Sequence, residues 1–274
     1  MKKNTTIALL GAGNIGISIA KGLFQSGSFL PKNITLTRRN INLLNKMKEI
    51  GFKIETRNLV AVKNSEIILL AVEPQQLDKL LEEIGSRLIP GKQTVISVVS
   101  GVSIKQISAG ITKGVAIVRA MPNTAIAVRE SMTCLTSEKP HGKEIQIAES
   151  IFKTVGKTLV IDEECMTAAT ALGACGIAFF LRAIRAASQG GIEVGFNSED
   201  AIKIAAQTAK GAGSLLLRSE HHPEYEIDRV TTPRGCTIAG LNYMEHEGFS
   251  SAMIKGIITS AEKASNLYTG KKGK

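Results

Sequence analysis

The first 160 residues alternate between short runs of β-branched apolar residues and longer stretches with helical periodicity. In the helical stretches, such as 15–25 and 75–88, apolar residues recur every three or four positions, which is the spacing of a helix with one buried face. Strands separated by crossover helices form βαβ units, and these build a mostly parallel, doubly wound α/β sheet. The predicted strands are 7–10, 33–37, 52–55, 66–71, 94–99, 115–119, 132–136 and 158–161.

The pattern changes after residue 161. Strand-like runs disappear, alanine becomes frequent, and apolar residues keep a helical spacing, as in 201–216. Pro223 and Pro233 bracket a short connecting segment in this half. We therefore predict an α/β domain over 1–161 and an all-helical domain over 162–274. Helices with no sheet to cover them bury their apolar faces against another subunit, so we expect a homodimer or a higher homo-oligomer.

A glycine-rich turn follows the first predicted strand and opens the first helix. In such a turn the first glycine makes a tight bend, the second lets the backbone approach a pyrophosphate, and the third lets helix and strand pack closely. The helix N-terminus then offers unpaired N–H groups and a partial positive charge to the phosphates. A turn without a ligand is the alternative, but the position between strand and helix favours a dinucleotide site. The residues predicted to form it are Gly11, Ala12, Gly13, Asn14, Ile15 and Gly16.

The end of the second predicted strand indicates which dinucleotide is bound. An NAD site has an acidic residue there for the ribose hydroxyls, whereas an NADP site lacks the acid and favours arginine. Here the strand ends in Thr37-Arg38-Arg39, with no carboxylate. We therefore predict NADPH, with Arg38 either stacking on the adenine or holding the 2′-phosphate and with Thr37 donating to that phosphate. A solvated basic turn is the alternative, and NADH is a possible substitute.

Composition excludes several other classes of protein. Apolar residues make up 43% of the 274 residues and charged residues 21%, which excludes wholesale disorder. Residues 1–161 carry a net charge of +11, but no nucleic-acid-binding motif accompanies it, and the chain has no tryptophan to stack on bases. We expect no nucleic-acid partner.

Membrane, secretion and metal signals are also missing from the sequence. No apolar run approaches the ~20 residues of a membrane span, and the N-terminus has no signal-peptide pattern. Metal-ligand spacing and a disulfide framework are both lacking among the four cysteines, Cys134, Cys165, Cys175 and Cys236. We therefore predict a cytoplasmic protein with no metal and no membrane partner.

Further motifs extend over nearly the whole chain. They are Ala71-Val72-Glu73-Pro74, Arg119-Ala120-Met121-Pro122-Asn123-Thr124, His222-Pro223 and the segment 230–240, which reads VTTPRGCTIAG. Their order and spacing resemble the pyrroline-5-carboxylate reductase family. The resemblance implies NAD(P)H-dependent reduction of the cyclic imine 1-pyrroline-5-carboxylate to L-proline, the last step of proline biosynthesis. It also implies a Rossmann domain followed by a helical dimerisation domain.

The same resemblance implies roles for individual residues. Thr237 is the candidate catalytic hydroxyl near the imine nitrogen, and the backbone N–H groups of 235–237 are candidates for binding the substrate carboxylate. An ordinary helix N-cap is the alternative for Thr237, and a helix-terminus pair is favoured for His221-His222. The substrate site comprises Thr232, Gly235, Cys236, Thr237, Glu163 and Glu220. Further residues predicted to bind the cofactor are Asn58, Ala71, Val72, Pro74 and Asn123.

Three segments depart from the family's pattern. Glu73 stands where lysine is usual, Ile177 lies where the family has proline, and Arg234 replaces the first glycine of Pro-Gly-Gly. A reductase of a related cyclic imine and a non-catalytic NADPH-binding paralogue therefore remain alternatives. A β-hydroxyacid dehydrogenase shares the two-domain plan, but the Lys-x-x-x-Asn pair of such enzymes does not occur between 162 and 274.

Overall fold

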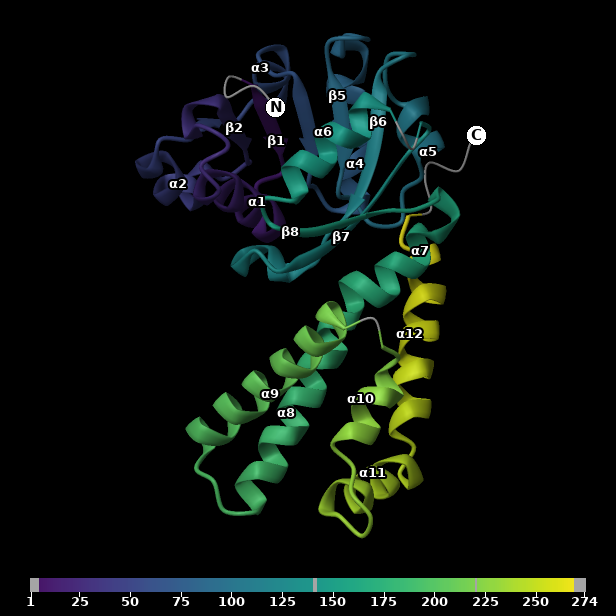
Figure 1. Cartoon of the computed structure of the whole chain (residues 1–274). Helices are drawn as coiled ribbons and strands as arrows, with labels where there is room; N and C mark the ends of the chain where they lie inside the picture. Colours follow the sequence, from purple (N-terminus) through teal and green to yellow (C-terminus); the bar gives the residue numbers. More distant parts are fainter. Residues whose placement is uncertain (1–4, 140–141, 220, 269–274) are drawn as a thin grey trace. The chain divides into compact units, whose positions relative to one another are not determined.

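A computed structural model describes residues 5–139, 142–219 and 221–268 (Figure 1). The chain forms two compact units. The first comprises Met1–Cys175 and Ser260–Lys274, and the second comprises Gly176–Thr259. Helix α12 (Phe249–Ser265) passes from the second unit into the first. The domain boundary after residue 161 stays a prediction, while the first compact unit itself extends to Cys175 and takes in the end of the chain.

An eight-stranded sheet forms the centre of the first unit, in the order β3-β2-β1-β4-β5-β6-β7-β8. β6 and β7 pair antiparallel, and the other described neighbours are parallel. The first six strands have the order of a dinucleotide-binding domain. Each strand overlaps a predicted run, so the mostly parallel α/β fold is confirmed. The strands are β1 (Ile7–Leu10), β2 (Ile34–Thr37), β3 (Lys53–Glu55), β4 (Ile67–Leu70), β5 (Thr94–Ser97), β6 (Ala116–Met121), β7 (Ser131–Ser137) and β8 (Gly156–Val160).

Helices cover both faces of this sheet (Figure 1). Those of the first unit are α1 (Asn14–Gln25), α2 (Asn45–Ile50), α3 (Asn58–Lys63), α4 (Pro74–Ile84), α5 (Ile104–Ala109), α6 (Lys143–Phe152) and α7 (Met166–Ala169). A π-helix, η6 (Thr170–Cys175), continues α7. Short 3-10 helices are η1 (Pro31–Asn33), η2 (Ile41–Leu44), η3 (Gly85–Arg87), η4 (Thr124–Val128) and η5 (Glu163–Cys165). The second unit contains α8 (Gly176–Glu193), α9 (Ser198–Arg218), α10 (Pro223–Arg229), α11 (Cys236–His246) and most of α12.

The core lies on the two sides of the sheet. On β1, Ile7 and Leu9 belong to the cluster that α1 and α6 cover, while Ala8 and Leu10 belong to the cluster that α3, α4 and α5 cover. All four residues are fully buried. Because both faces are covered, the strands read as continuous apolar runs rather than as an alternation. The carboxyl ends of the strands remain as the edge at which loops meet a ligand.

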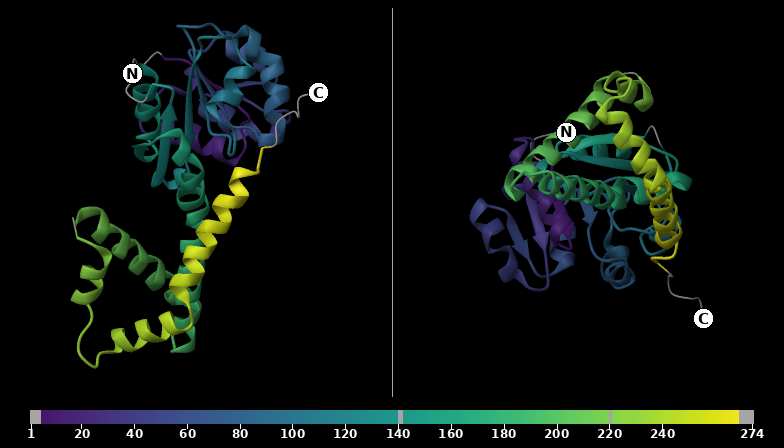
Figure 2. Two further views of the ribbon diagram at one scale, coloured as in Figure 1. Left: turned by 90° about the vertical axis from the view of Figure 1, so that its right-hand side faces the viewer. Right: turned by 90° about the horizontal axis from the view of Figure 1, so that it is seen from below.

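The second unit has little core of its own. α8 and α9 pack as an antiparallel hairpin (Figures 1 and 2). Ala201 is the one buried residue of α9, and none of the described residues of α11 is buried. Large apolar side chains are exposed instead, including Val194 at 80% and Leu217 at 82%. These helices therefore present apolar surface that the unit itself does not cover.

One helical stretch, which begins in the first unit and continues into α8, is long enough to span a bilayer. Residues Glu163–Glu193 meet the length and hydropathy of a membrane helix by composition alone, and 17% of the most apolar window is buried within the chain. The expectation that no stretch would do so is wrong, because α7, η6 and α8 form one helical run in which residues 165–181 carry no charged side chain. Phe180 and Leu181 are among its exposed side chains.

Candidate functional site

The glycine loop after β1 combines two closely packed glycines with one that faces open space. Gly11 has φ +91°, and a Cβ on it would lie 2.7 Å from the carbonyl oxygen of Ala71. A Cβ on Gly16 would lie 2.6 Å from Leu9 Cδ2 and 2.9 Å from the carbonyl oxygen of Gly11. A Cβ on Gly13 would meet no described atom within 4 Å. The loop is thus fixed by packing at both ends and open in the middle, where a pyrophosphate needs close access to backbone.

The end of β2 holds this loop in place. The carbonyl oxygen of Thr37 accepts hydrogen bonds from the N–H groups of Ala12 at 2.9 Å and of Gly11 at 3.3 Å. Arg38 Nη1 donates to the carbonyl oxygen of Ala12 at 3.0 Å. The predicted phosphate-binding arginine therefore lies against the predicted pyrophosphate loop, with further guanidinium N–H groups left to donate. α1 begins at Asn14, with Ile15 in its first turn and no side chain capping its N-terminus, so its first N–H groups face the same space.

The hydroxyl of Thr37, predicted to donate to the 2′-phosphate, is bonded within the protein. It donates to Asn58 Oδ1 at 2.7 Å, and Asn58 Nδ2 donates to Glu83 Oε2 at 2.8 Å. The hydrogen of the Thr37 hydroxyl is therefore already used within the protein, and Thr37 is buried. The structure brings Thr37, Arg38 and Asn58 together as predicted neighbours, and it adds Glu83, which no sequence pattern indicated.

The loop after β4 and the end of β6 contribute the other predicted cofactor residues. Ala71 and Val72 touch the position of a Cβ on Gly11, and Pro74 begins α4, as expected for a proline in a first helical turn. Asn123 is held differently. Its Oδ1 accepts from the N–H of Ala125 and its Nδ2 donates to the carbonyl oxygen of Gly173 in the π-helix, both at 3.0 Å. Its amide is thus engaged at both ends by the protein.

Glu163 is anchored within the first unit. Its Oε1 accepts from Arg119 Nη1 at 3.1 Å and from the N–H of Ile104 at 2.6 Å. The Arg119 side chain is 9% exposed and that of Glu163 is 36% exposed. Burial lowers the pKa of Arg119, and the hydrogen bond and charge of Glu163 oppose that effect. The observed role of Glu163 is therefore to neutralise a buried arginine and to fix the start of α5, while its role toward a substrate stays a prediction.

The predicted substrate residues of the second unit lie at the start of α11. The N-cap of this helix is Gly235, so the alternative that Thr237 is its N-cap is wrong. The N–H of Gly235 is not available to a carboxylate, because it donates to the carbonyl oxygen of Thr232 at 2.9 Å. The N–H groups of Cys236 and Thr237 belong to the first turn of the helix and receive no side-chain cap.

A tight turn positions this helix start. Arg234 has φ +60°, a region that favours glycine. A Cβ on Gly235 would lie 2.4 Å from Thr232 Oγ1, so glycine is required there. Arg234 therefore adopts the conformation of the glycine it replaces, at a backbone cost of about 1–2 kcal/mol.

The residues before α10 are partly described. Glu220 lies outside the described residues. His222 is the N-cap of α10, with its Nδ1 accepting from the N–H of Glu224 at 3.3 Å, which confirms the helix-terminus interpretation. His221 stacks on Tyr225 with a centroid separation of 4.2 Å.

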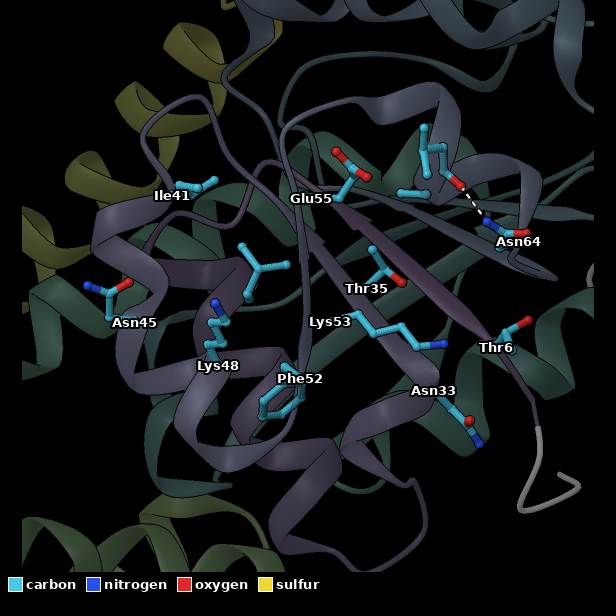
Figure 3. Close-up of a pocket in the computed structure, with 13 residues that line it drawn as sticks. Thr6, Asn33, Thr35, Ile41, Asn45, Lys48, Phe52, Lys53, Glu55 and Asn64 are labelled. Carbon is cyan, nitrogen blue, oxygen red and sulfur yellow. Dashed lines mark hydrogen bonds between the residues drawn. The ribbon is translucent and has the colours of Figure 1, made fainter.

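A cavity of about 500 Å³ lies apart from these residues, beside the edge strand β3 (Figure 3). Lys48, Lys53 and Glu55 line it, and Asn64 on its rim donates to the carbonyl oxygen of Val60. None of the predicted site residues that the structure describes lines this cavity. Among the described residues, no cluster of three or more His, Cys, Asp or Glu side chains is placed to hold a metal ion.

The open position at Gly13 gives a direct test of the dinucleotide site. Gly13→Ala is expected to weaken NADPH binding about 5- to 30-fold, or about 1–2 kcal/mol, because the new methyl group overfills the space that the pyrophosphate needs. The melting temperature of the protein alone should not change, since the methyl group meets no protein atom. Gly213→Ala, also in open space but on α9, is the control. Wild-type NADPH affinity in Gly13→Ala, measured by calorimetry, would contradict this assignment.

Comparisons with known proteins add to this geometry. Residues 6–101 match the family described as "NADP oxidoreductase coenzyme F420-dependent", and residues 163–267 match "Pyrroline-5-carboxylate reductase dimerisation". Pyrroline-5-carboxylate reductase 1 of Dictyostelium discoideum is 53% identical over 277 residues, which cover 97% of this chain and 50% of that protein. The chain thus spans half the length of that relative.

Two further proteins are similar over almost their full length. Pyrroline-5-carboxylate reductase 2 of Dictyostelium discoideum is 47% identical over 281 residues, covering 97% of this chain and 94% of the relative. The crystal structure of a Plasmodium falciparum pyrroline carboxylate reductase with NADP bound has a TM-score of 0.89 at 23% identity, covering 97% of this chain and 99% of that one. The second of these likenesses supports the fold.

Proposed function

The chain belongs to the pyrroline-5-carboxylate reductase family, and we propose on that basis that it reduces 1-pyrroline-5-carboxylate to L-proline with NADPH, the last step of proline biosynthesis. The observation that carries this proposal is the 47% identity to a named reductase across 94% of its length. Bound NADPH supplies a hydride, which the imine carbon accepts while the imine nitrogen holds the proton.

The first unit supplies the residues proposed to bind the cofactor. The open backbone at Gly13 receives the pyrophosphate, and the first N–H groups of α1 face its charge. Arg38, free of any described acidic partner, faces the 2′-phosphate while it holds Ala12. The match of residues 6–101 to an NADP oxidoreductase family supports NADPH as the cofactor. NADH remains a weaker substitute in this proposal.

The second unit supplies residues proposed to bind the substrate. The N–H groups of Cys236 and Thr237 bind the carboxylate at the positive end of α11. The hydroxyl of Thr237 hydrogen-bonds the imine nitrogen, and Thr232 shapes the turn through its contact with Gly235. Because the imine already carries the proton it needs, the protein mainly orients the reactants and requires no strong acid.

Turnover with a single substrate and a single cofactor tests the proposal. Mixed with pyrroline-5-carboxylate and NADPH, the protein should form one proline for each NADPH consumed. Faster turnover of a related cyclic imine would identify that imine, and not pyrroline-5-carboxylate, as the substrate. Tight NADPH binding without turnover of either imine would identify a non-catalytic paralogue and overturn the proposal.

We further propose that the second unit forms a homodimer. A unit that leaves Val194 and Leu217 about four-fifths exposed requires a partner surface, and the match of 163–267 to a dimerisation family supports a second copy of this chain. A cytoplasmic location is part of the same proposal, because the four cysteines are free thiols, which fits a reducing compartment.

Leu217→Glu is expected to raise the dimer dissociation constant at least about 10-fold, because it places a charge in an apolar contact that excludes water. Sedimentation velocity over a concentration series measures this directly. Gln207→Glu introduces the same charge at an exposed polar position of α9 and should leave the dimer intact. Equal dissociation constants for wild type and Leu217→Glu would exclude the end of α9 from the interface.

A further inference from the structure

The C-terminal part of α12 and the residues just after it pack against the loop that follows β5. Gly101 in this loop has φ +77°, and a Cβ on it would lie 3.0 Å from Leu267 Cβ and 3.2 Å from the carbonyl oxygen of Ala264. Residues 264–268, here called the C-terminal strap, therefore touch the loop backbone directly. Figure 2 shows the yellow end of α12 reaching this part of the first unit, to which residues 260–274 belong.

The strap is also bonded to α4. The hydroxyl of Tyr268 donates to Asp78 Oδ1, and the Tyr268 ring packs on the core cluster that α4 covers. Burial first, and then the hydrogen bond and charge of Asp78, raise the pKa of Tyr268 to about 12. The hydroxyl therefore keeps its proton and stays a donor throughout the neutral range.

The contact with Gly101 and the bond to Asp78 hold neighbouring segments at the carboxyl ends of the strands, where the cofactor is proposed to bind. β4 and β5 pair in parallel, so the segments that follow them leave the sheet side by side at the edge where ligands bind. Asp78 lies in the second turn of α4, directly after the loop that contains Ala71 and Val72. The loop after β5 is tethered at its far end by Glu163, which accepts from the N–H of Ile104.

We propose that the C-terminal strap is a positioning element of the cofactor site, and that Tyr268 acts by holding the loops after β4 and β5 in the geometry that binds NADPH. The inference rests on the proposed function, because NADPH is the ligand. The inference assigns residues 264–268 to cofactor binding. The match to the dimerisation family ends at residue 267, one residue before Tyr268, whose hydroxyl makes the bond to Asp78. Tyr268 touches neither substrate nor cofactor in this account.

Removing the hydroxyl from the full-length chain tests the proposal. Tyr268→Phe is expected to raise the NADPH dissociation constant about 3- to 10-fold, a typical size for a residue that acts through a loop. The KM for NADPH should rise by the same factor while kcat at saturating NADPH stays within about twofold, because the strap affects binding and not the reacting atoms. Tyr243→Phe removes the same group from an exposed residue of α11 and should change neither constant.

Asp78→Ala provides the matched partner variant. It should reproduce the loss of affinity, and the double variant should be no worse than either single one, since both remove the same bond. Wild-type NADPH affinity in Tyr268→Phe would overturn the proposal, and so would a lower melting temperature with unchanged affinity, which marks a purely structural bond. Failure of the wild type to bind NADPH would instead overturn the proposed function, and the inference with it.

Discussion

Arg38→Ala is expected to weaken NADPH binding about 10- to 150-fold, because charge-assisted hydrogen bonds to a phosphate contribute about 1.5–3 kcal/mol each. NADH, which lacks the 2′-phosphate, should lose far less. The comparison with NADH is needed because Arg38 also donates to the carbonyl oxygen of Ala12, and the loss of that bond would affect both cofactors. Titrating NADPH and NADH against the wild type and Arg38→Ala separates the contact of Arg38 with the phosphate from its contact with Ala12.

An equal loss for the two cofactors would mean that Arg38 only braces the glycine loop. Equal affinity of the wild type for NADPH and NADH would contradict the preference for NADPH altogether. Arg87→Ala, which removes an exposed guanidinium beyond α4, is the control for general charge effects. Measurements at two ionic strengths should show a steeper salt dependence for NADPH than for NADH in the wild type only.

Thr237→Val is expected to lower kcat/KM for pyrroline-5-carboxylate about 5- to 150-fold, or about 1–3 kcal/mol, because it removes one hydrogen bond to the imine nitrogen. The substitution keeps the shape of the side chain. Gly235 is the N-cap of α11, so the loss of the Thr237 hydroxyl should not remove a cap, and the melting temperature should stay the same.

Thr237→Ser keeps the hydroxyl and should retain most of the activity. NADPH affinity should be equal in the wild type and both variants, since only a residue proposed to bind the substrate is altered. If Thr237→Val reduces the imine as fast as the wild type, the hydroxyl has no part in the reaction.

Local chemistry explains what the sequence predicted well. The β1 run is buried on both faces and leads directly into a loop in which packing requires Gly11 and Gly16, so pattern and motif agreed on the sheet and the glycine turn. Pro74 begins α4 and the His222 side chain caps α10, and both effects act within one helical turn. Such signals are contained in a few consecutive residues, and a single sequence is enough to read them.

Contacts between distant segments were not predictable in this way. Tyr268 and Asp78 are 190 residues apart, and no periodicity links them. The hydrophobic pattern places Arg119 in a strand but does not indicate which residue neutralises its charge. Glu163 does so because η5 lies beside β6. The hydrogen bond from Thr37 to Asn58 was not predictable for the same reason, because Asn58 approaches Thr37 from another βαβ unit.

Transfer of a deuterium label tests the central claim most directly. The protein is mixed with pyrroline-5-carboxylate and NADPH that carries deuterium at C4 of the nicotinamide on one face, and then in a second reaction on the other face. Mass spectrometry of the proline formed should show one deuterium at the former imine carbon with one of the two labelled cofactors and none with the other. Proline without deuterium in both reactions, or no proline at all, would contradict the account.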